Sequence, residues 1–521
     1  MSADAPPATN VAPSIRDEKS GPTEIVPQSS NDALIRPAGW QYKSFTVFGR
    51  ELWYASPKVQ LFMVAMVCFL CPGMFNALSG MGGGGQIDTK PSNDANTALY
   101  STFAVVAFFA GTIANVVGVR LTLSLGGIGY SVYVAAFLCY NHTQNRGFVV
   151  FSGAFLGVCA GLLWTAQGAI MMSYPPEESK GRYISWFWAI FNMGAVIGAL
   201  PPFDLQSNIL LAQIPLAQNV HNDAGPVNDG TYAAFLALTF IGALLALLLC
   251  NAKSVIREDG SKVILMKNPT WKSEFIGLYE TIADDPWIIL LFPMFMSSNI
   301  FYTYQLNDMN ALNFNTRTRA LNSLLYWSAQ IIGALLYGYA LDIGSVGRAM
   351  RAKIAWAMLM VLTFAVWGGG WAWQKDQPTR EVVTSKEWES QKIDWTNGSR
   401  YYEPMVLFFF YGLFDALWQT SVYWFMGALS NSGRKAANLA GIYKSLQSAF
   451  AAIWWAMDGK KISFDAMFGS TWGFLAGGLL FAGPIIFLRI KDTVSVEEDL
   501  KFSDETAEDV AAKASTKEQN V

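Results

Sequence analysis

The stretch TYAAFLALTFIGALLALLLC, from Thr231 to Cys250, carries no charged side chain and is followed directly by the charged segment 252–284. A helix of about 20 apolar residues, rising about 1.5 Å per residue, spans the hydrocarbon core of a bilayer. Lipid offers no hydrogen-bond partners, so a spanning segment must pair its own backbone N–H and C=O groups, as a helix does. The stretch therefore predicts a transmembrane helix that ends at a polar loop.

Similar apolar segments recur on both sides of residues 252–284. The predicted spans are 59–81, 95–117, 120–140, 147–173, 183–202 and 231–251 in the first half, and 285–307, 319–341, 351–373, 403–428, 436–457 and 467–488 in the second. The composition agrees, because 52% of the residues are hydrophobic and 14% are charged, whereas soluble proteins average about 25% charged. We therefore predict an all-α membrane protein with twelve transmembrane helices in two six-helix halves.

This pattern divides the chain into five regions. Residues 1–57 are expected to form a disordered cytoplasmic tail with a membrane-proximal segment, and residues 490–521 a second disordered cytoplasmic tail, because both are polar. Between them lie the N-terminal half (58–251), the cytoplasmic central loop (252–284) and the C-terminal half (285–489).

Lysine and arginine residues concentrate in loops on one side of the predicted membrane. The segments 252–284, 342–353 and 429–435 are basic, whereas 203–230, on the opposite side, has no Lys or Arg. Positive residues favour the cytoplasmic side, so both termini are predicted to be cytoplasmic. The loop 375–402 departs from this rule, since it carries five basic residues on the predicted outer side.

Two glycosylation sequons support the same orientation. Asn141 begins Asn-His-Thr and Asn397 begins Asn-Gly-Ser, and both fall in loops predicted to face away from the cytoplasm. We therefore predict a glycosylated multi-pass protein, in the plasma membrane or an internal membrane.

A short motif appears after the second predicted helix of the C-terminal half. It reads GYALDIGSVGRAMR from Gly338 to Arg351, and the matching stretch of the first half reads GTIANVVGVR from Gly111 to Arg120. The motif resembles the loop that recurs in the major facilitator superfamily, whose two halves are related by an axis along the membrane normal. The residues of interest are Gly338, Asp342, Gly344 and Arg348 in the second copy, and Asn115 and Arg120 in the first.

This motif has two interpretations. In the first, the carboxylate of Asp342 binds a helix N-terminus or an arginine and acts as a latch that stabilises one cytoplasmic conformation. The glycines allow the helices to approach closely. Asn115 replaces the acid in the first half, which weakens a latch there. The alternative is that both stretches are simply tight turns.

Three longer sequence motifs indicate the family within this superfamily. They are FNALSGMGGGGQ (Phe75–Gln86), GLLWTAQG (Gly161–Gly168) and SNIFYTYQLN (Ser298–Asn307). They resemble the fungal branch of the uncoordinated-93-like (Unc-93-like) family within the major facilitator superfamily. The resemblance implies the transporter fold, but it leaves the activity open. The best-known animal relatives regulate potassium channels or help receptors to traffic, whereas fungal members are generally presumed to be transporters.

In the fold implied by this resemblance, the first, fourth, seventh and tenth helices line a central cavity. Polar and aromatic residues concentrate on those helices: Asn76, Trp164, Gln167, Asn299, Tyr302, Tyr304, Gln305, Trp418 and Gln419. Such groups can hold a neutral or weakly polar solute by hydrogen bonds and stacking. The alternative is that they only join neighbouring helices. No arginine lies in the middle of a span, which disfavours a strongly anionic substrate.

Two charged residues fall inside predicted spans. Asp415 lies near the middle of the tenth helix and Lys444 lies about two turns into the eleventh. A charge in the middle of a bilayer costs about 2.5–3.5 kcal/mol on insertion scales, so each needs a partner or a wet cavity. Three interpretations are open: a structural ion pair between them, a titratable Asp415 that couples proton movement to transport, and a lysine that reaches the cytoplasmic surface.

Other kinds of chemistry are disfavoured. The run Gly82–Gly85 lacks the lysine and flanking strand of a phosphate loop, so we interpret it as a flexible or closely packed helix end. Cys68 and Cys71 are interpreted as core residues, and the two histidines are too few for a histidine-rich metal site. With a net charge of −3 and no basic stripe, nucleic acid is not an expected partner.

We therefore predict that the chain is not an enzyme and needs no cofactor. The leading hypothesis is alternating-access transport of a small, unidentified solute, with proton coupling as one variant. The alternative is a non-transporting regulatory or trafficking subunit for another membrane protein, such as a channel or receptor. In either case the lipid bilayer is a partner.

Overall fold

The computed structural model describes most of the chain between residues 39 and 492. The described residues are 39–47, 49–86, 88–174, 180–199, 227, 229–251, 254–256, 276, 279–280, 282–341, 343–383, 385, 387–429 and 433–492. Residues 1–38 of the predicted tail 1–57, residues 493–521 of the predicted tail 490–521, and most of the predicted central loop lie outside this part of the structure.

The first membrane helix runs from Pro57 to Gly80 in three parts. It begins as α1 (Pro57–Cys68), passes through a π-helical turn, η2 (Phe69–Gly73), and continues as α2 (Met74–Gly80). Ser56 caps its start, accepting a hydrogen bond from the N–H of Val59 at 3.3 Å. Pro72 lies inside η2 and lacks an N–H, which is why regular pairing is interrupted there.

Helices account for most of the remaining described structure. In the first half these are α3 (Lys90–Val117), α4 (Val119–Thr143), α5 (Arg146–Ser173), α6 (Lys180–Ala199) and α7 (Asp229–Ala246), and in the second η8 (Pro286–Leu291), α9 (Phe292–Met296), η9 (Thr303–Ala311), α10 (Thr316–Leu341), α11 (Arg348–Gln374), α13 (Ser399–Leu429), α14 (Gly433–Gly459) and α15 (Phe464–Leu488). Short elements are η1 (Trp40–Tyr42), β1 (Ser44–Val47), β2 (Arg50–Trp53), η3 (Gly83–Gly85), α12 (Arg380–Val383), η10 (Glu387–Gln391) and η11 (Trp395–Asn397).

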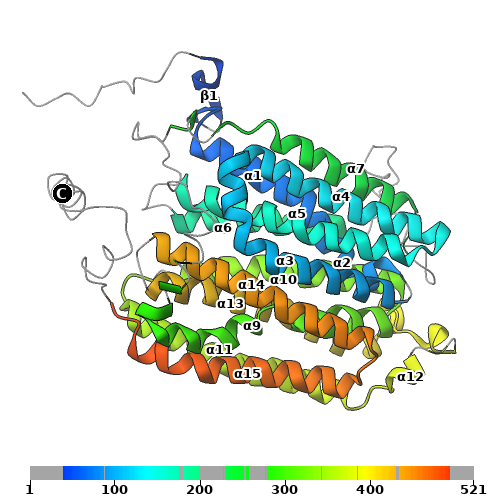
Figure 1. The fold of residues 1–521 in the computed structure, drawn as a ribbon. Helices are drawn as coiled ribbons and strands as arrows, with labels where there is room; N and C mark the ends of the chain where they lie inside the picture. Colours follow the sequence, from blue (N-terminus) through cyan, green and yellow to red (C-terminus); the bar gives the residue numbers. More distant parts are fainter. Residues whose placement is uncertain are drawn as a thin grey trace, which may run out of the picture.

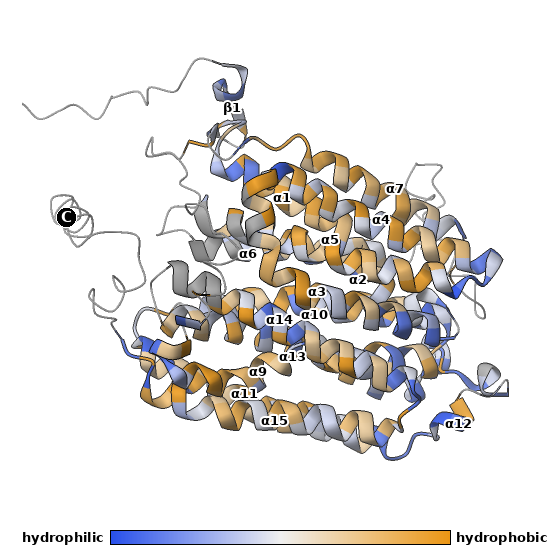
Figure 2. Ribbon diagram, viewed as in Figure 1, coloured by the Kyte–Doolittle hydropathy of each residue, from blue (hydrophilic) through white to orange (hydrophobic). Residues whose placement is uncertain are grey.

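Eight helices among the described residues are long and apolar enough to cross a membrane, and two shorter apolar helices accompany them. Figure 2 shows the hydrophobic colour running along the helices, with the hydrophilic colour gathered at their ends and in the loops. The helices α3 and α14, of 28 and 27 residues, lie alongside this set. An all-α membrane protein is therefore confirmed, while the full count of twelve spans stays a prediction.

The helices form two groups that repeat the same contacts (Figure 1). In the first half α3 packs on α5 and α4 on α7; in the second half the equivalent pairs are α10 on α13 and α11 on α15. The halves meet through two equivalent pairs, α3 with α14 and α6 with α10. Because each pair in one half has its counterpart in the other, the two halves are internal repeats, as in the major facilitator superfamily.

Glycines allow the closest crossings within each half. A Cβ on Gly157 of α5 would lie 2.9 Å from the carbonyl carbon of Leu99 in α3, and one on Gly412 of α13 would lie 2.9 Å from the Cα of Tyr326 in α10. These two contacts occupy equivalent pairs of the repeat. Close backbone approach through small residues is a usual means of helix association in lipid.

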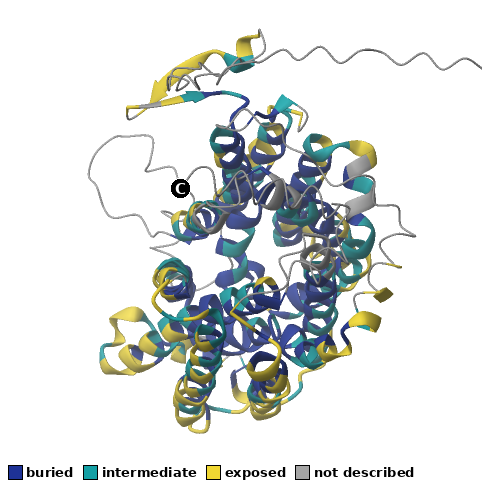
Figure 3. Cartoon of the chain, turned by 90° about the vertical axis from the view of Figure 1, so that its left-hand side faces the viewer, coloured by how far each residue is buried: buried dark blue, intermediate teal, exposed yellow. Residues whose placement is uncertain are grey.

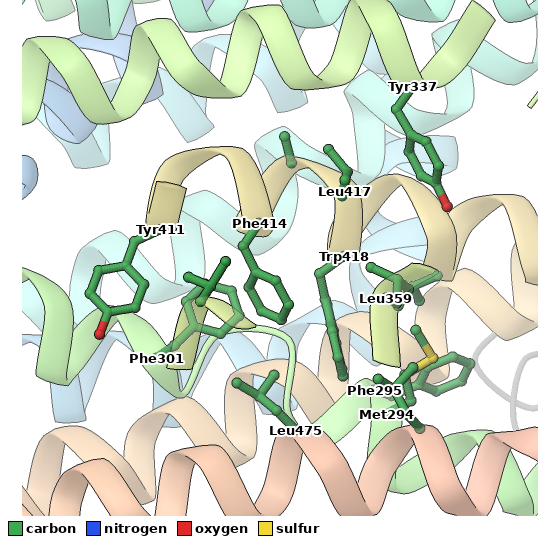
Figure 4. Packing of buried hydrophobic residues seen from close by; sticks show 14 of the residues in the cluster. Met294, Phe295, Phe301, Tyr337, Leu359, Tyr411, Phe414, Leu417, Trp418 and Leu475 are labelled. Atoms are coloured by element: carbon green, nitrogen blue, oxygen red, sulfur yellow. The ribbon is translucent and has the colours of Figure 1, made fainter. Parts of the chain in front are cut away.

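Each half has its own buried core. Figure 4 shows Trp418 and Phe414 projecting from α13 toward Leu475 of α15 and Met294 of α9. These four side chains are almost fully buried. Viewed along the bundle in Figure 3, buried residues face the middle of each group and exposed ones lie mostly around the outside.

The seventh helix differs from the prediction of one regular span at 285–307. It starts as the 3₁₀-helical η8, continues as α9, and becomes the π-helical η9, which extends to Ala311. Every residue of η9 is buried, although most of its side chains are polar or small. This segment is held by side-chain contacts from other helices, which hydropathy does not reveal.

The membrane-proximal segment of the N-terminal region is structured. β1 and β2 pair as an antiparallel hairpin, at the opposite end of the bundle from α12 (Figure 1). The hydroxyl of Tyr42 donates to the carbonyl of Ser254 at 3.0 Å, and that of Tyr54 donates to the carbonyl of Leu248 at 2.6 Å. The segment is thereby attached to the chain that follows α7.

Enlarging Gly412 should destabilise the second half. We expect Gly412→Val to lower the free energy of unfolding by about 1–3 kcal/mol, because the added methyl groups meet the backbone of α10. The measurement is thermal unfolding of the purified protein in detergent. Gly427→Val, on the same helix but with open space around its Cβ position, is the matched control and should change stability by no more than about 0.5 kcal/mol. Equal effects of the two variants would contradict the assigned crossing.

Candidate functional site

A small cavity lies between the two halves. Its volume is about 40 Å³, which is room for a few water molecules. Its lining residues are Phe75, Asn76, Ser79, Asn96, Tyr100, Tyr302, Leu306, Trp327 and Trp455. They come from α2, α3, the seventh helix, α10 and α14, so both halves contribute.

The cavity wall contains two unpaired hydrogen-bond donors. The indole N–H groups of Trp327 and Trp455 are buried and have no hydrogen-bond partner. A buried donor without a partner costs about 1–3 kcal/mol, so each indole N–H would be stabilised by an acceptor that a change of conformation brought within reach. Asn76 and Ser79, from the first helix, add further polar groups to the same wall.

Asp415 lies directly behind this wall. It is fully buried in α13, and one carboxylate oxygen, Oδ2, accepts three hydrogen bonds. The donors are the hydroxyl of Tyr302 at 2.8 Å, the hydroxyl of Tyr326 at 3.1 Å and the side-chain amide of Gln330 at 2.5 Å. The other oxygen, Oδ1, has no partner. Because Tyr302 also lines the cavity, it connects the cavity to the carboxylate.

Asp415 and Lys444 make no direct contact in this structure, although an ion pair was one of the three interpretations open from the sequence. The ammonium of Lys444 donates instead to the side-chain oxygen of Gln447 at 2.9 Å and lies 5.1 Å from the ring centroid of Tyr443. Neutral donors contact one oxygen of Asp415, and aromatic rings lie close to Lys444, so each charge has partners of its own. Both residues are described, and no contact of ion-pair length joins them.

A second polar network surrounds Lys444. Gln447 donates to the side-chain oxygens of Asn299 at 2.8 Å and Gln419 at 3.2 Å, and Gln419 donates to the carbonyl of Ser298 at 2.7 Å. The hydroxyl of Tyr443 donates to the side-chain oxygen of Gln419. Asn299 and Gln419 were predicted to line the cavity, but they link α13 and α14 to the seventh helix instead.

The other predicted cavity residues lie in different places. Tyr304 donates to Gln374 at 2.6 Å within the second half, the side-chain amide of Gln305 lies 2.9 Å from the hydroxyl of Tyr326, and Trp418 donates to Ser298 at 3.1 Å. Trp164 packs on Trp188 and Phe191, and Gln167 is buried on α5. Of the nine residues predicted from sequence, Asn76 and Tyr302 line the cavity.

The glycine turn after the first helix seals one end of the bundle, which the sequence predicts to face away from the cytoplasm and which we call the outer end. The guanidinium of Arg319 donates to the carbonyls of Met81 and Gly82, each at 2.5 Å. Gly82 and Gly84 have φ of +72° and +60°, which only glycine adopts readily. A Cβ on Gly84 would lie 2.6 Å from the ring of Phe137, so this end is closely packed.

Three asparagines also help to close the outer end, through hydrogen bonds between the two halves. The amide of Asn307 donates to Asn93 of α3 at 2.6 Å, and its oxygen accepts from the N–H of Gly83 at 2.8 Å. Asn310 donates to the carbonyl of Gly80 at 2.8 Å. The outer end is therefore closed in this conformation by hydrogen bonds between the first and seventh helices.

The glycine-and-arginine motif occupies a turn between α10 and α11. Arg348 donates to the carbonyl of Lys491 at 2.8 Å, so it contacts its own half. Gly338 lies near α6, since a Cβ placed on it would be 3.9 Å from the hydroxyl oxygen of Ser185. Gly344 lies in the turn and Arg120 is half-buried at the start of α4. Asp342, and the side chain of Asn115, lie outside the described part of the structure, so the predicted latch stays a prediction.

The two sequons differ in their surroundings. The side-chain nitrogen of Asn141 donates to Asp229 at 2.9 Å and to the carbonyl of Val227 at 3.2 Å. Asn397 lies exposed in η11, where its oxygen accepts from the N–H of Asp394 at 2.6 Å. A glycan is attached through the side-chain nitrogen of asparagine. That nitrogen is already hydrogen-bonded in Asn141, so the geometry favours Asn397 as the glycosylated residue.

The outer loop 375–402 is attached to the bundle through Asp394. Arg317 and Asn315 of the adjoining segment donate to its Oδ2 at 2.8 Å and 2.6 Å. Burial acts to raise the pKa of Asp394, but the hydrogen bonds from Arg317, the Thr396 N–H and Asn315 outweigh it and hold the pKa below its ordinary value. The loop is therefore held by an ion pair as well as by its backbone.

Several residues of these networks were not singled out from the sequence. Tyr326 and Gln330 lie on α10, which was not expected to face the cavity, and Trp327 and Trp455 resemble ordinary core residues. Asp308 and Asp458 lie just beyond predicted span ends, where charge is unremarkable. The available signal was the density of Asn, Asp and Gln in residues 305–315.

Comparison with solved structures defines the class of protein. The chain is similar to the fucose:proton symporter of E. coli, with a TM-score of 0.51 and 11% identity over 82% of this chain and 98% of that one. It is equally similar to a D-xylose-proton symporter, with a TM-score of 0.51 and 12% identity over 84% and 99% of the two chains. At these identities the likeness shows the fold alone, which is that of the major facilitator superfamily.

Sequence comparison defines the family. A family model described as "Ion channel regulatory protein UNC-93" matches residues 84–457. An UNC93-like protein of Schizosaccharomyces pombe is 47% identical over 480 residues, 92% of this chain and 90% of that protein. UNC93-like protein 1 of Arabidopsis thaliana is 40% identical over 440 residues, covering 84% and 92%. The chain therefore belongs to the UNC-93 family, as its sequence phrases predicted.

Glycosylation should distinguish the two sequons. We expect Asn397→Gln to remove an endoglycosidase-sensitive mobility shift, because the Asn397 side chain is exposed on the predicted outer side. Asn141→Gln should leave the shift unchanged, because its nitrogen is already hydrogen-bonded. The measurement is gel mobility after expression in a eukaryotic host. A shift lost only in Asn141→Gln would contradict the assignment.

Proposed function

We propose that this protein is an alternating-access secondary transporter of a small, neutral, polar solute, coupled to proton movement through Asp415. The observation that carries the proposal is the cavity between the halves, where the unpaired indole N–H groups of Trp327 and Trp455 face no protein acceptor. Sugar–proton symporters are among the solved structures that share the fold.

The cavity chemistry indicates the kind of solute. Its wall combines aromatic rings with side-chain amides and hydroxyls, and the described residues that line it include no charged side chain. Such a wall matches a ligand with carbonyl or hydroxyl acceptors and apolar surface, rather than an anion. In the present closed conformation the space is small, so a solute requires the halves to separate at one end.

Asp415 is placed to sense both solute and proton. Tyr302 lines the cavity and donates to the carboxylate, so a ligand that competes for its hydroxyl removes one of three donors. Losing a donor destabilises the ionised form, while Oδ1 offers a position for a proton. Solute binding and protonation of Asp415 would then favour each other.

Neutralising Asp415 tests the coupling. We expect Asp415→Asn to abolish the pH dependence of solute flux and to lower flux by about tenfold or more, because the amide cannot carry a proton through the cycle. The substrate is first sought by metabolite profiling of cells with and without the protein, and flux is then measured at matched surface expression. Asp376→Asn, an exposed acid-to-amide change in the outer loop, is the control and should retain normal flux. Unchanged pH-dependent flux in Asp415→Asn would exclude this role.

Removing one cavity donor tests the binding site. We expect Trp455→Phe to raise KM for the identified solute by about 2- to 10-fold, which corresponds to one neutral hydrogen bond of about 0.5–1.5 kcal/mol. The change in kcat should be smaller. Trp371→Phe, an exposed tryptophan on α11, is the matched control. A KM that is the same in both variants would place the solute elsewhere.

The second candidate is a regulatory subunit, because the matching family model is described as an ion channel regulatory protein. In that case no solute flux would depend on the protein. Asp415→Asn and Trp455→Phe would both restore a deletion phenotype, whereas changes on lipid-facing or loop surfaces would not.

A further inference from the structure

A buried pair of acids lies at the outer end, separate from Asp415 and the cavity. Asp308 belongs to η9 and Asp458 to the end of α14, and one arginine, Arg380 of α12, contacts both. Its guanidinium donates to Asp308 Oδ1 at 2.9 Å and to Asp458 Oδ1 at 2.5 Å. The three side chains are at most 7% exposed, so water contributes little to their solvation.

The charges of this group do not balance. Two carboxylates meet one guanidinium, and Asp308 Oδ2 is buried without a hydrogen-bond donor. The two carboxyl groups accept from the two terminal nitrogens of the same guanidinium, which holds them close together. Two carboxylates that share one buried site do not both ionise readily, and a single proton held between them supplies the missing donor.

The described residues that hydrogen-bond to Asp458 from the first half and from the seventh helix are uncharged. Asn93 of α3 donates to Asp458 Oδ2 at 2.7 Å and Asn307 donates to it at 3.1 Å, and both are neutral. The face of Arg380 lies 4.4 Å from the ring centroid of Phe464 on α15.

Nearby titratable groups are engaged elsewhere or exposed. Asp94 of α3 pairs with Lys90 at 3.3 Å and Arg146 at 2.7 Å, while Asp465 of α15 and Lys460 after α14 are exposed. Arg319, across η9, donates to backbone carbonyls of the first helix. Among the described residues, Arg380 is therefore the one cation in contact with the acid pair.

The pair also joins the two halves. Asp458 of the second half accepts from Asn93 of the first, and Asn93 in turn accepts from Asn307, whose oxygen is bound to Gly83. Separating the outer ends would break these bonds and expose both acids to water, where each ionises.

We propose that Asp308 and Asp458 form a proton-binding site, and that the shared proton holds the outer ends of the two halves together. The proton is taken from water as the ends close and is returned to water as they separate, and no other covalent bond changes. The role of this proton-binding site in transport rests on the alternating-access function proposed above. The site itself is separate from the solute cavity.

The test measures the separation of the outer ends directly. Nitroxide labels are placed at Thr143→Cys in the first half and Glu403→Cys in the second, both exposed, in a background with Cys139→Ser and Cys250→Ser. The distance between labels is measured by pulsed electron paramagnetic resonance on the full chain in lipid nanodiscs. Samples span mildly acidic to mildly alkaline pH.

We expect the population of separated ends, longer by about 5 Å or more, to grow at alkaline pH in the parent protein. Asp308→Asn carries its own donor in place of the proton, so it should keep the short distance at every pH. Asp465→Asn, an exposed acid on the neighbouring helix, should follow the parent. A distance distribution that does not change with pH in the parent, or one that shifts normally in Asp308→Asn, would overturn the proposal. No solute is present, so this result is independent of whether flux is found.

Discussion

Every polar backbone group of a membrane-spanning segment must find a partner away from water, and the structure follows from how that requirement is met. Regular helices meet it through their own backbone bonds. At the end of the first helix, where regular pairing stops, side chains from the second half complete its backbone groups. Arg319 donates to the carbonyls of Met81 and Gly82, and Asn310 donates to that of Gly80. The irregular segments are therefore also the points where the halves contact each other.

Close helix crossings stabilise each half, whereas polar contacts join the two halves. Within each half, glycines such as Gly157 and Gly412 bring backbones into contact at equivalent positions of the repeat, and these crossings make each half a unit. Between the halves, amides and charged groups meet at the outer end and around the cavity. Interhelical hydrogen bonds in lipid are individually modest, so an interface built from them can separate more readily than a packed core.

Buried acids occur in two different settings. Asp415 has one carboxylate oxygen saturated by three neutral donors, which disperses its charge without a counter-ion. Asp308 and Asp458 instead share a single arginine, which leaves one negative charge in excess. Three neutral donors surround one oxygen of Asp415, whereas Asp308 Oδ2 lacks a donor, which a proton would supply. The two sites can thus respond differently to the same change in pH.

The sequence by itself determined the membrane class, the two halves and the family, because apolar length and recurring phrases are local properties of the chain. It also located Asp415 as a buried charge, since a charge within an apolar span is visible in one dimension. The tertiary structure decided what each polar residue contacts: Asp415 meets Tyr302, Tyr326 and Gln330 rather than Lys444. It also brought together Asp308 and Asp458, 150 positions apart in the chain. Such pairings depend on the rotation and depth of each helix, which are set by packing against neighbours and leave no trace in hydropathy.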